Sequence, residues 1–213
     1  GLATGAPWTI ALFTQDAAGN WSGVSNSTSA AATAAPLSPA GGAILARTES
    51  VVTSTFAYSL GASSYTFVMS TATDNPPVAV AGSSVTTMLS GAISPLTPNT
   101  TYYGFVNACN GVGCSAYTAL GSTVTLANPP VTLSTTALSS VSATLAWGAN
   151  GNPTGTAYEV QTATGLGGPY SVSFSTTGVN TPVTGLSPGT AVCYRVLSRS
   201  WDNVPTAPSN ELC

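Results

Sequence analysis

The chain has 213 residues, enough for about two domains of roughly 100 residues each. Apolar residues make up 43%, so a packed core is expected, whereas charged residues make up only 4%, against about 25% in an average soluble protein. With three Arg, no Lys and no His, the chain lacks a basic patch for nucleic acid, an imidazole for metal or triad chemistry, and a Lys for a Schiff base or P-loop.

The rest of the composition is typical of an all-β chain with many turns. Ser and Thr together exceed a quarter of the residues, with 22 Gly and 15 Pro, while the side chains that amphipathic helices need are scarce. A net charge of −3 gives such a surface little protection against association. The nearly uncharged surface has several explanations: neutral glycans that cover it, neighbouring subunits that bury it, or an environment that penalises charge. Compositional drift is the alternative.

The sequence shows neither a membrane span nor a leader. No stretch approaches the roughly 18 consecutive apolar residues that span a membrane. No signal peptide is visible at Gly1. Because the first residue is not Met, we expect a processed chain or a fragment.

Three stretches of the chain resemble one another, at residues 1–12, 95–106 and 185–196. In each, an alternating strand begins six residues after a Leu, with a turn-forming stretch between them. These residues, Leu2, Leu96 and Leu186, are 94 and 90 residues apart, which is a domain-sized period.

Alternating segments also lie upstream of the second and third repeats. Val52, Ser54, Phe56 and Tyr58 correspond to Val141, Ala143, Leu145 and Trp147. Tyr65, Phe67 and Met69 correspond to Tyr158 and Val160. Alternation with period two predicts half-buried antiparallel strands of a sandwich.

These features together resemble a tandem array of fibronectin type III domains. The likeness rests on the buried aromatic of the second strand, Trp147 with Tyr58 as its counterpart, on Tyr158-Glu159-Val160, and on the turn from Leu186 to Thr190. The stretch Asp16–Ser22 looks like the F–G loop and G strand of bacterial members. The resemblance covers nearly the whole chain and implies immunoglobulin-like β-sandwiches of a bacterial-type secreted or surface protein.

The resemblance divides the chain into a partial domain, residues 1–35, and two domains, residues 36–128 and 129–213. Residues 26–42 and Asn128-Pro129-Pro130 are the expected junctions, because Pro stiffens a link between domains. The partial domain holds only the final F and G strands. Either the chain is an excerpt of a longer array, or the hairpin completes a sheet on another subunit or packs on the second domain.

Four cysteines lie in positions that would face each other across F–G hairpins. Cys109 and Cys114 flank a four-residue turn, and Cys193 and Cys213 are each ten residues from Asn203. Two disulfides are therefore expected, and they imply an extracellular or periplasmic location. Free thiols are the alternative, and the spacing does not suit zinc.

Several polar residues are candidate sites. Asn20, Asn26 and Asn99 begin N-glycosylation sequons, and O-linked sugars on Ser or Thr are an alternative. Asp16, Asp74 and Asp202 are separate loop acids that we interpret as turn caps, because a Ca²⁺ site needs clustered carboxylates.

The F–G loop Trp201-Asp202-Asn203 is a candidate binding loop, since an exposed Trp beside an Asp suits a sugar or a protein partner. The alternative is a Trp folded over its own hairpin near Pro205, and Trp21 has the same ambiguity. Glu159 and Arg195 are expected to face solvent as a cross-strand pair. No two acids share a motif for acid–base catalysis.

Three functions fit this sequence. The first is a non-catalytic extracellular structural protein, a segment of a surface filament, sheath or stalk that self-associates through β-strand edges or domain faces. The second is an adhesive or carbohydrate-binding module that uses the Trp-bearing loops. The third is a spacer of a secreted polysaccharide-degrading enzyme. We expect no cofactor, metal, nucleic acid, membrane insertion or catalysis in these residues.

Overall fold

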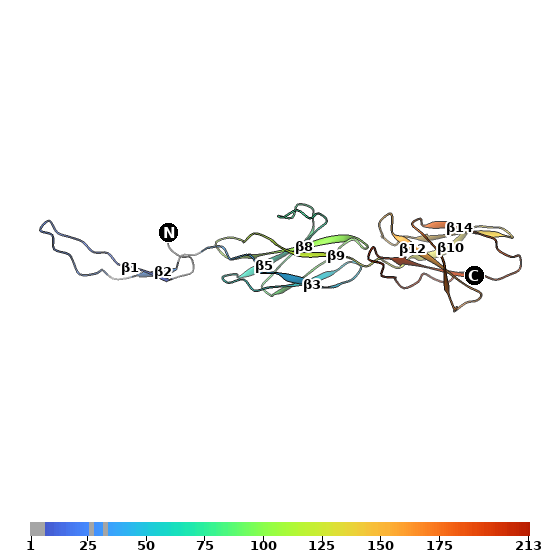
Figure 1. The fold of residues 1–213 in the computed structure, drawn as a ribbon, viewed down its shortest axis with the longest axis horizontal. Coiled ribbons are helices and arrows are strands. Elements are labelled where there is room, and N and C mark those ends of the chain that lie inside the picture. The colour runs from blue at the N-terminus through green and yellow to red at the C-terminus, as the bar shows by residue number, and fades with distance from the viewer. Residues whose placement is uncertain (1–6, 26–27, 32–33) are drawn as a thin grey trace.

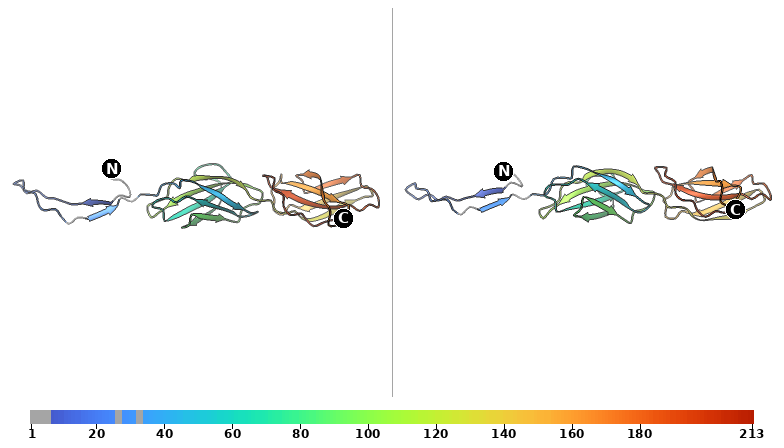
Figure 2. Two further views of the ribbon diagram at one scale, coloured as in Figure 1. Left: turned by 60° about the horizontal axis from the view of Figure 1, so that its bottom comes forward. Right: turned by 90° about the horizontal axis from the view of Figure 1, so that it is seen from below.

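Three β-structured units follow one another along the long axis of the molecule (Figure 1). The computed structural model describes residues 7–25, 28–31 and 34–213. All regular elements of this part are strands, and further views show the same end-to-end arrangement of a hairpin and two sandwiches (Figure 2). The all-β architecture expected from the sequence is confirmed.

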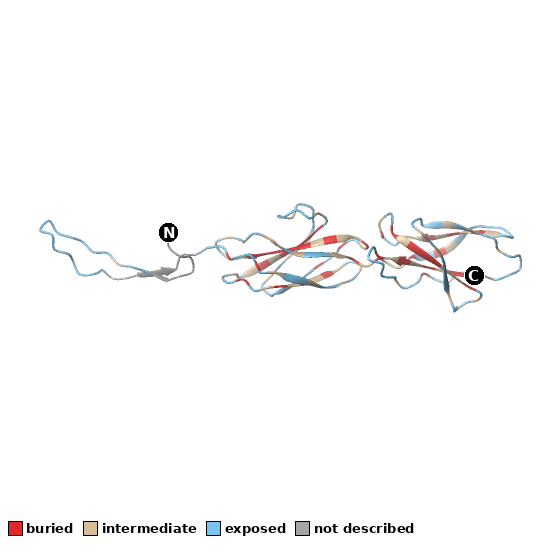
Figure 3. Ribbon diagram, in the orientation of Figure 1, coloured by how far each residue is buried: buried red, intermediate tan, exposed pale blue. Residues whose placement is uncertain are grey.

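The first unit is a two-stranded antiparallel hairpin of β1 (Pro7–Ile10) and β2 (Thr28–Ala31). Beyond the ladder, Gln15 and Trp21 form a bridge across the turn. Where its side chains are described, every residue of the hairpin except the half-buried Ala11 is exposed, in contrast to the buried interiors of the two sandwiches (Figure 3). Residues 1–6, which include Leu2, lie outside the described residues.

The second unit, which we call sandwich 2, packs a three-stranded sheet on a four-stranded sheet. The first has the order β3 (Gly42–Arg47), β4 (Val52–Phe56), β7 (Ser90–Ile93). The other has the order β6 (Val80–Thr86), β5 (Ser64–Ser70), β8 (Thr101–Cys109), β9 (Thr118–Val124). The inward-facing apolar residues of both sheets form one core, as alternation requires.

The third unit, sandwich 3, has two three-stranded sheets. One has the order β10 (Val131–Leu138), β11 (Ser142–Gly148), β14 (Asn180–Thr184). The other has the order β13 (Ser171–Thr176), β12 (Ala157–Ala163), β15 (Cys193–Arg199). Trp147 lies in the core at the edge of Tyr158, with ring centroids 5.6 Å apart.

The chain after β15 lies where the last strand of a sandwich is expected, but it forms only bridges. Tyr194 is bridged to Leu212, and Arg199 to Pro205. Pro205 and Pro208 have no N–H to give to a ladder. In their place, the hydroxyls of Thr206 and Ser209 accept hydrogen bonds from backbone N–H groups of β15.

The assignment of Tyr58 from the sequence as the buried aromatic residue of sandwich 2 is wrong. Tyr58 is 61% exposed, and Phe56 is the buried residue, with its ring centroid 5.2 Å from that of Tyr65. The strand ends at Phe56, so the alternation does not continue to Tyr58. Val141 is likewise exposed, because it precedes β11.

The last part of the first expected junction is bonded to sandwich 2. The carbonyl of Ala34 accepts from Asn110 Nδ2 at 2.8 Å, that of Leu37 from Ser59 Oγ at 2.5 Å, and that of Pro39 from Thr118 Oγ1 at 2.7 Å. Residues 34–39 therefore lie along sandwich 2, and the N-terminal hairpin extends away from it (Figure 1).

Candidate functional site

One turn motif recurs in all three units. Its bridged pairs are Gln15 with Trp21, Cys109 with Cys114, and Arg199 with Pro205. The residue after each bridge, Ser22, Ser115 or Thr206, accepts a backbone N–H of the preceding strand through its hydroxyl, at 3.0, 3.0 and 3.1 Å. A Ser or Thr directly after the bridge is the sequence signal of this turn. It marks the N-terminal hairpin as the same kind of unit as the F–G hairpins of the sandwiches.

The shared register shows which hairpin residues occupy core positions. Leu12, Val106 and Val196 each lie three residues before the bridged residue. Val106 and Val196 are fully buried, but Leu12 is 70% exposed. Ile10, at the place of the buried Tyr194, is 52% exposed. The hairpin therefore presents core positions to solvent.

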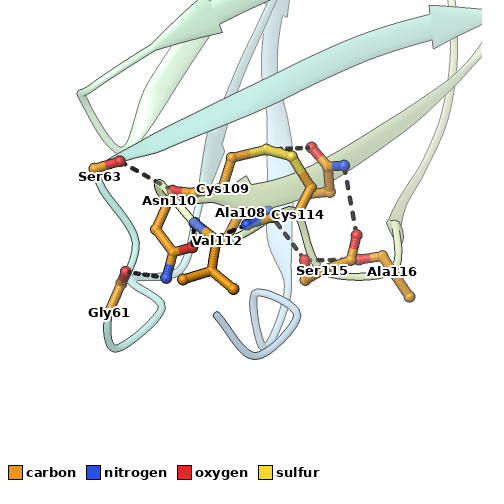
Figure 4. Close-up of a disulfide and its surroundings, with 11 residues drawn as sticks. Gly61, Ser63, Ala108, Cys109, Asn110, Val112, Cys114, Ser115 and Ala116 are labelled. Atoms are coloured by element: carbon orange, nitrogen blue, oxygen red, sulfur yellow. Dashed lines mark hydrogen bonds between the residues drawn. A yellow bond between two sulfur atoms is a disulfide. The ribbon is translucent and has the colours of Figure 1, made fainter. Parts of the chain in front are cut away.

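Both disulfides expected from the sequence are present. Cys109–Cys114 closes the turn after β8, where Asn110 caps the loop by accepting from the N–H groups of Val112 and Gly113 and donating to Gly61 (Figure 4). Cys193–Cys213 joins the start of β15 to the last residue of the chain. In each case one covalent bond fastens an F–G hairpin.

The loop Trp201-Asp202-Asn203 lies at the contact between the two sandwiches, which we call the joint. Asp202 forms an ion pair with Arg47 of sandwich 2, and the N–H of Trp201 donates to Asn99 Oδ1 at 2.8 Å. Asp202 is thus an interdomain partner, and its interpretation as a turn cap is corrected. The indole of Trp201 is 56% exposed, although its backbone is held.

Asn99 is central to the joint. It is fully buried, its Nδ2 donates to Thr156 Oγ1 at 2.8 Å, and its Oδ1 accepts from Trp201. The amide is thus occupied at both ends by sandwich 3. The structure contradicts Asn99 as a glycosylation site, because a glycan on Nδ2 has no space in the closed joint.

The link between the sandwiches is also hydrogen-bonded to sandwich 3. The N–H of Asn128 donates to Asn152 Oδ1 at 2.8 Å, and Asn152 Nδ2 donates back to the carbonyl of Asn128 at 2.8 Å. Ser200 Oγ accepts the N–H of Ala127 at 2.9 Å. The N–H groups of Ala127 and Asn128 and the carbonyl of Asn128 are therefore paired, as their removal from water requires.

The remaining sequons differ in their setting. Asn20 is exposed, with its Nδ2 3.0 Å from Asp16 Oδ2, and stays a candidate glycosylation site. Asn26 lies outside the described residues. Asp16 caps its turn as expected, because its Oδ1 accepts from the N–H groups of Ala18 and Asn20. Hydrogen bonds from the Asn20 side chain and backbone lower the pKa of Asp16.

The expected pair of Glu159 with Arg195 is replaced by a row of contacts. Glu159 is only 5% exposed and binds Arg199, at 2.6 Å to Nη2 and 2.8 Å to Nε. Gln161 donates to Glu159 at 2.6 Å and accepts from Arg195 Nε at 2.7 Å, while Arg195 lies 4.2 Å from the centroid of the Tyr170 ring. Glu159 is on the outer face as expected, but its neighbours cover it.

The electrostatics of Glu159 follow from this row. Burial acts to raise the pKa of Glu159, but hydrogen bonds from Gln161 and Arg199 and the charge of Arg199 outweigh it. The pKa of the carboxyl is therefore held below its usual value. The arrangement is a structural ion-pair row, with its polar groups engaged by one another.

Within the described part of the chain, no group of three His, Cys, Asp or Glu side chains could hold a metal ion. The same residues include no helix long and apolar enough to cross a membrane.

Comparisons with known proteins give the fold. No protein-family model and no curated protein matches the chain. Among solved structures, it is similar to a segment of two fibronectin type III domains from chicken tenascin, with a TM-score of 0.52 and 17% identity over 82% of this chain and 96% of that one. It also matches the FN1–FN3 domains of chicken CNTN1, with a TM-score of 0.37 and 16% identity over 91% of this chain and 71% of that one. The chain has the fold of tandem fibronectin type III domains.

Proposed function

We propose that this tandem of fibronectin type III-like domains is a non-catalytic extracellular structural segment of a surface filament, sheath or stalk. The domains are residues 1–35, in part, 36–128 and 129–213. The observation that carries the proposal is the N-terminal hairpin, where Leu12 is 70% exposed although its counterparts in both sandwiches are fully buried. Such a hairpin is stabilised only when further β-structure covers it.

The partner that we propose is a second copy of the chain, which associates through β-strand edges or domain faces. A two-stranded sheet offers unpaired N–H and C=O groups at its edges, which suit strand addition by another chain. The surface supports close packing as well, since a chain with 4% charged residues has little charge to desolvate. The two hairpin disulfides favour an oxidising location outside the cytoplasm.

Negative-stain electron microscopy of the natively purified protein tests this function. Regular filaments or tubes are expected, and Leu12→Asp is expected to abolish them because the charge would lie in the new contact. The matched control is Leu45→Asp in β3, where a Leu that is likewise exposed is changed in the same way. Isolated two-bead particles from the unchanged chain would overturn the structural proposal.

An adhesive or carbohydrate-binding function is the second candidate. The observation that favours it is Trp201, whose indole is 56% exposed while the joint fixes its backbone. An exposed aromatic on a held loop loses little entropy on binding. A glycan array with Trp201→Ala as the loss-of-binding variant and Tyr58→Ala as the exposed-aromatic control tests it, and equal binding by all three chains rules it out.

A further inference from the structure

The two sandwiches differ at the end from which the chain leaves each of them, which we call the C-terminal pole. In sandwich 2, Arg47 pairs with Val52 at this pole, and in sandwich 3 Leu138 pairs with Ala143 at the equivalent place. Arg47 binds Asp202 across the joint, whereas Leu138 is 78% exposed. A charged residue thus stands where sandwich 3 docks on sandwich 2, and an exposed apolar residue stands at the equivalent place of sandwich 3.

A second position differs in the same way. The turns before β8 and β15 contain Pro98-Asn99-Thr100 and Pro188-Gly189-Thr190, and both Asn99 and Gly189 have left-handed backbone, with φ of 44° and 75°. Gly adopts this conformation without strain, and Asn is one of the few residues with a side chain that tolerates it. The turn needs only Gly, so the Asn99 side chain serves its contacts with sandwich 3.

We propose that Arg47 and Asn99 form a docking code that fixes sandwich 3 on sandwich 2 as one rigid rod. The partner it fits is a sandwich pole presenting a hydroxyl, a backbone N–H and a carboxylate, as Thr156, Trp201 and Asp202 do here. The amide of Asn99 needs one acceptor and one donor, and the guanidinium of Arg47 needs an anion. The C-terminal pole of sandwich 3, with Leu138 and Gly189, does not dock a sandwich in this way.

The buried position of Asn99 makes the joint sensitive to hinge motion. Tilting one sandwich away breaks both bonds of its amide together with the ion pair of Arg47. The stiff Pro129-Pro130 link and the two hydrogen bonds between Asn128 and Asn152 limit the swing further. The inference concerns the joint alone and does not depend on filament formation.

The test is residual dipolar couplings measured on the full chain, which report the alignment of each sandwich separately. In the unchanged protein the two sandwiches are expected to share one alignment tensor. Arg47→Leu with Asn99→Gly gives sandwich 2 the pole of sandwich 3, and Gly retains the left-handed turn, so sandwich 2 stays folded. This variant is expected to show two tensors of different magnitude and orientation.

The matched control makes the reverse exchange at the other pole, Leu138→Arg with Gly189→Asn, and is expected to keep one shared tensor. Dispersed amide spectra of both sandwiches in every variant establish that each remains folded. Asn99→Gly alone separates the amide from the ion pair, with an intermediate loss of shared alignment expected. Two tensors in the unchanged chain, or one in the Arg47→Leu/Asn99→Gly chain, would overturn the docking code, while microscopy reads the filament proposal independently.

Discussion

Leu12 in the N-terminal hairpin and Val196 in sandwich 3 lie three residues before the bridge of the same turn motif, yet one is 70% exposed and the other fully buried. Their turns share a bridge and a hydroxyl that accepts a backbone N–H. Local sequence is therefore sufficient for the turn, whereas burial needs strands that are distant in the chain. The comparison separates what a β-hairpin determines by itself from what a sandwich adds.

Charge placed at these two equivalent positions gives the largest contrast. Val196→Asp is expected to unfold sandwich 3, because a carboxylate in the core has no partner. Leu12→Asp is expected to leave the unfolding free energy of both sandwiches within about 0.5 kcal/mol of its original value. Urea denaturation followed by circular dichroism measures both. A clear loss of stability in Leu12→Asp would mean that the hairpin packs on a sandwich.

The F–G hairpins of the sandwiches carry disulfides, whereas the N-terminal hairpin has Gln15 and Trp21 at the bridged positions where sandwich 2 has cysteines. Removing the disulfides measures what this covalent bond adds to stability. Replacing Cys193 and Cys213 together by Ser is expected to destabilise sandwich 3 by about 3 kcal/mol. The same change at Cys109 and Cys114 is expected to destabilise sandwich 2 by about 2 kcal/mol, because the closed loop is shorter. Calorimetry of the two variants gives the order, and a reversed order would contradict the loop argument.

The shared hydroxyl provides a finer comparison. Thr206→Ala is expected to destabilise sandwich 3 by about 1 to 3 kcal/mol, because the N–H of the buried Ser198 loses its acceptor. Ser22→Ala removes the equivalent acceptor of an exposed N–H in the hairpin, where water replaces it, so no change in unfolding is expected. Equal losses in chemical denaturation would show that the hairpin is not exposed in solution.

The fold was largely predictable from the sequence because alternation and turns are local signals. The alternation of Ala143, Leu145 and Trp147 was followed by burial of all three. It misled at Tyr58, since nothing in the pattern marks the end of the strand at Phe56. The facing cysteines were found because antiparallel geometry relates spacing to contact.

The joint could not be predicted, because its partners are far apart in the chain. Asn99 and Thr156 are separated by 57 positions, and Asn99 and Trp201 by 102. In the sequence Asn99 begins a sequon, and its burial depends on how two domains meet. The surroundings of Glu159 were unpredictable for the same reason. Alternation placed Glu159 on the outer face, but it did not indicate that Arg199 and Gln161 would cover the carboxylate.

The smallest expected effect is the pH dependence that Glu159 gives to the stability of sandwich 3. The pKa of Glu159 is lower in the folded state than its ordinary value of 4.5. The ionised carboxyl therefore contributes stability that is fully present above pH 4.5 and is lost as pH falls through the folded-state pKa. Because the Arg199 side chain is 30% exposed, solvent screens the pair, and we expect a contribution of at most about 1 kcal/mol.

Glu159→Gln measures this contribution. Its unfolding free energy, from urea titrations at a series of pH values, is expected to fall below that of the unchanged chain above pH 4.5 and to converge with it in acid. Glu49→Gln in sandwich 2 is the matched control, since it removes one carboxylate without touching Arg199. If Glu159→Gln and the unchanged chain kept a constant difference down to the acid limit, the carboxyl would act through packing and hydrogen bonding rather than through its charge.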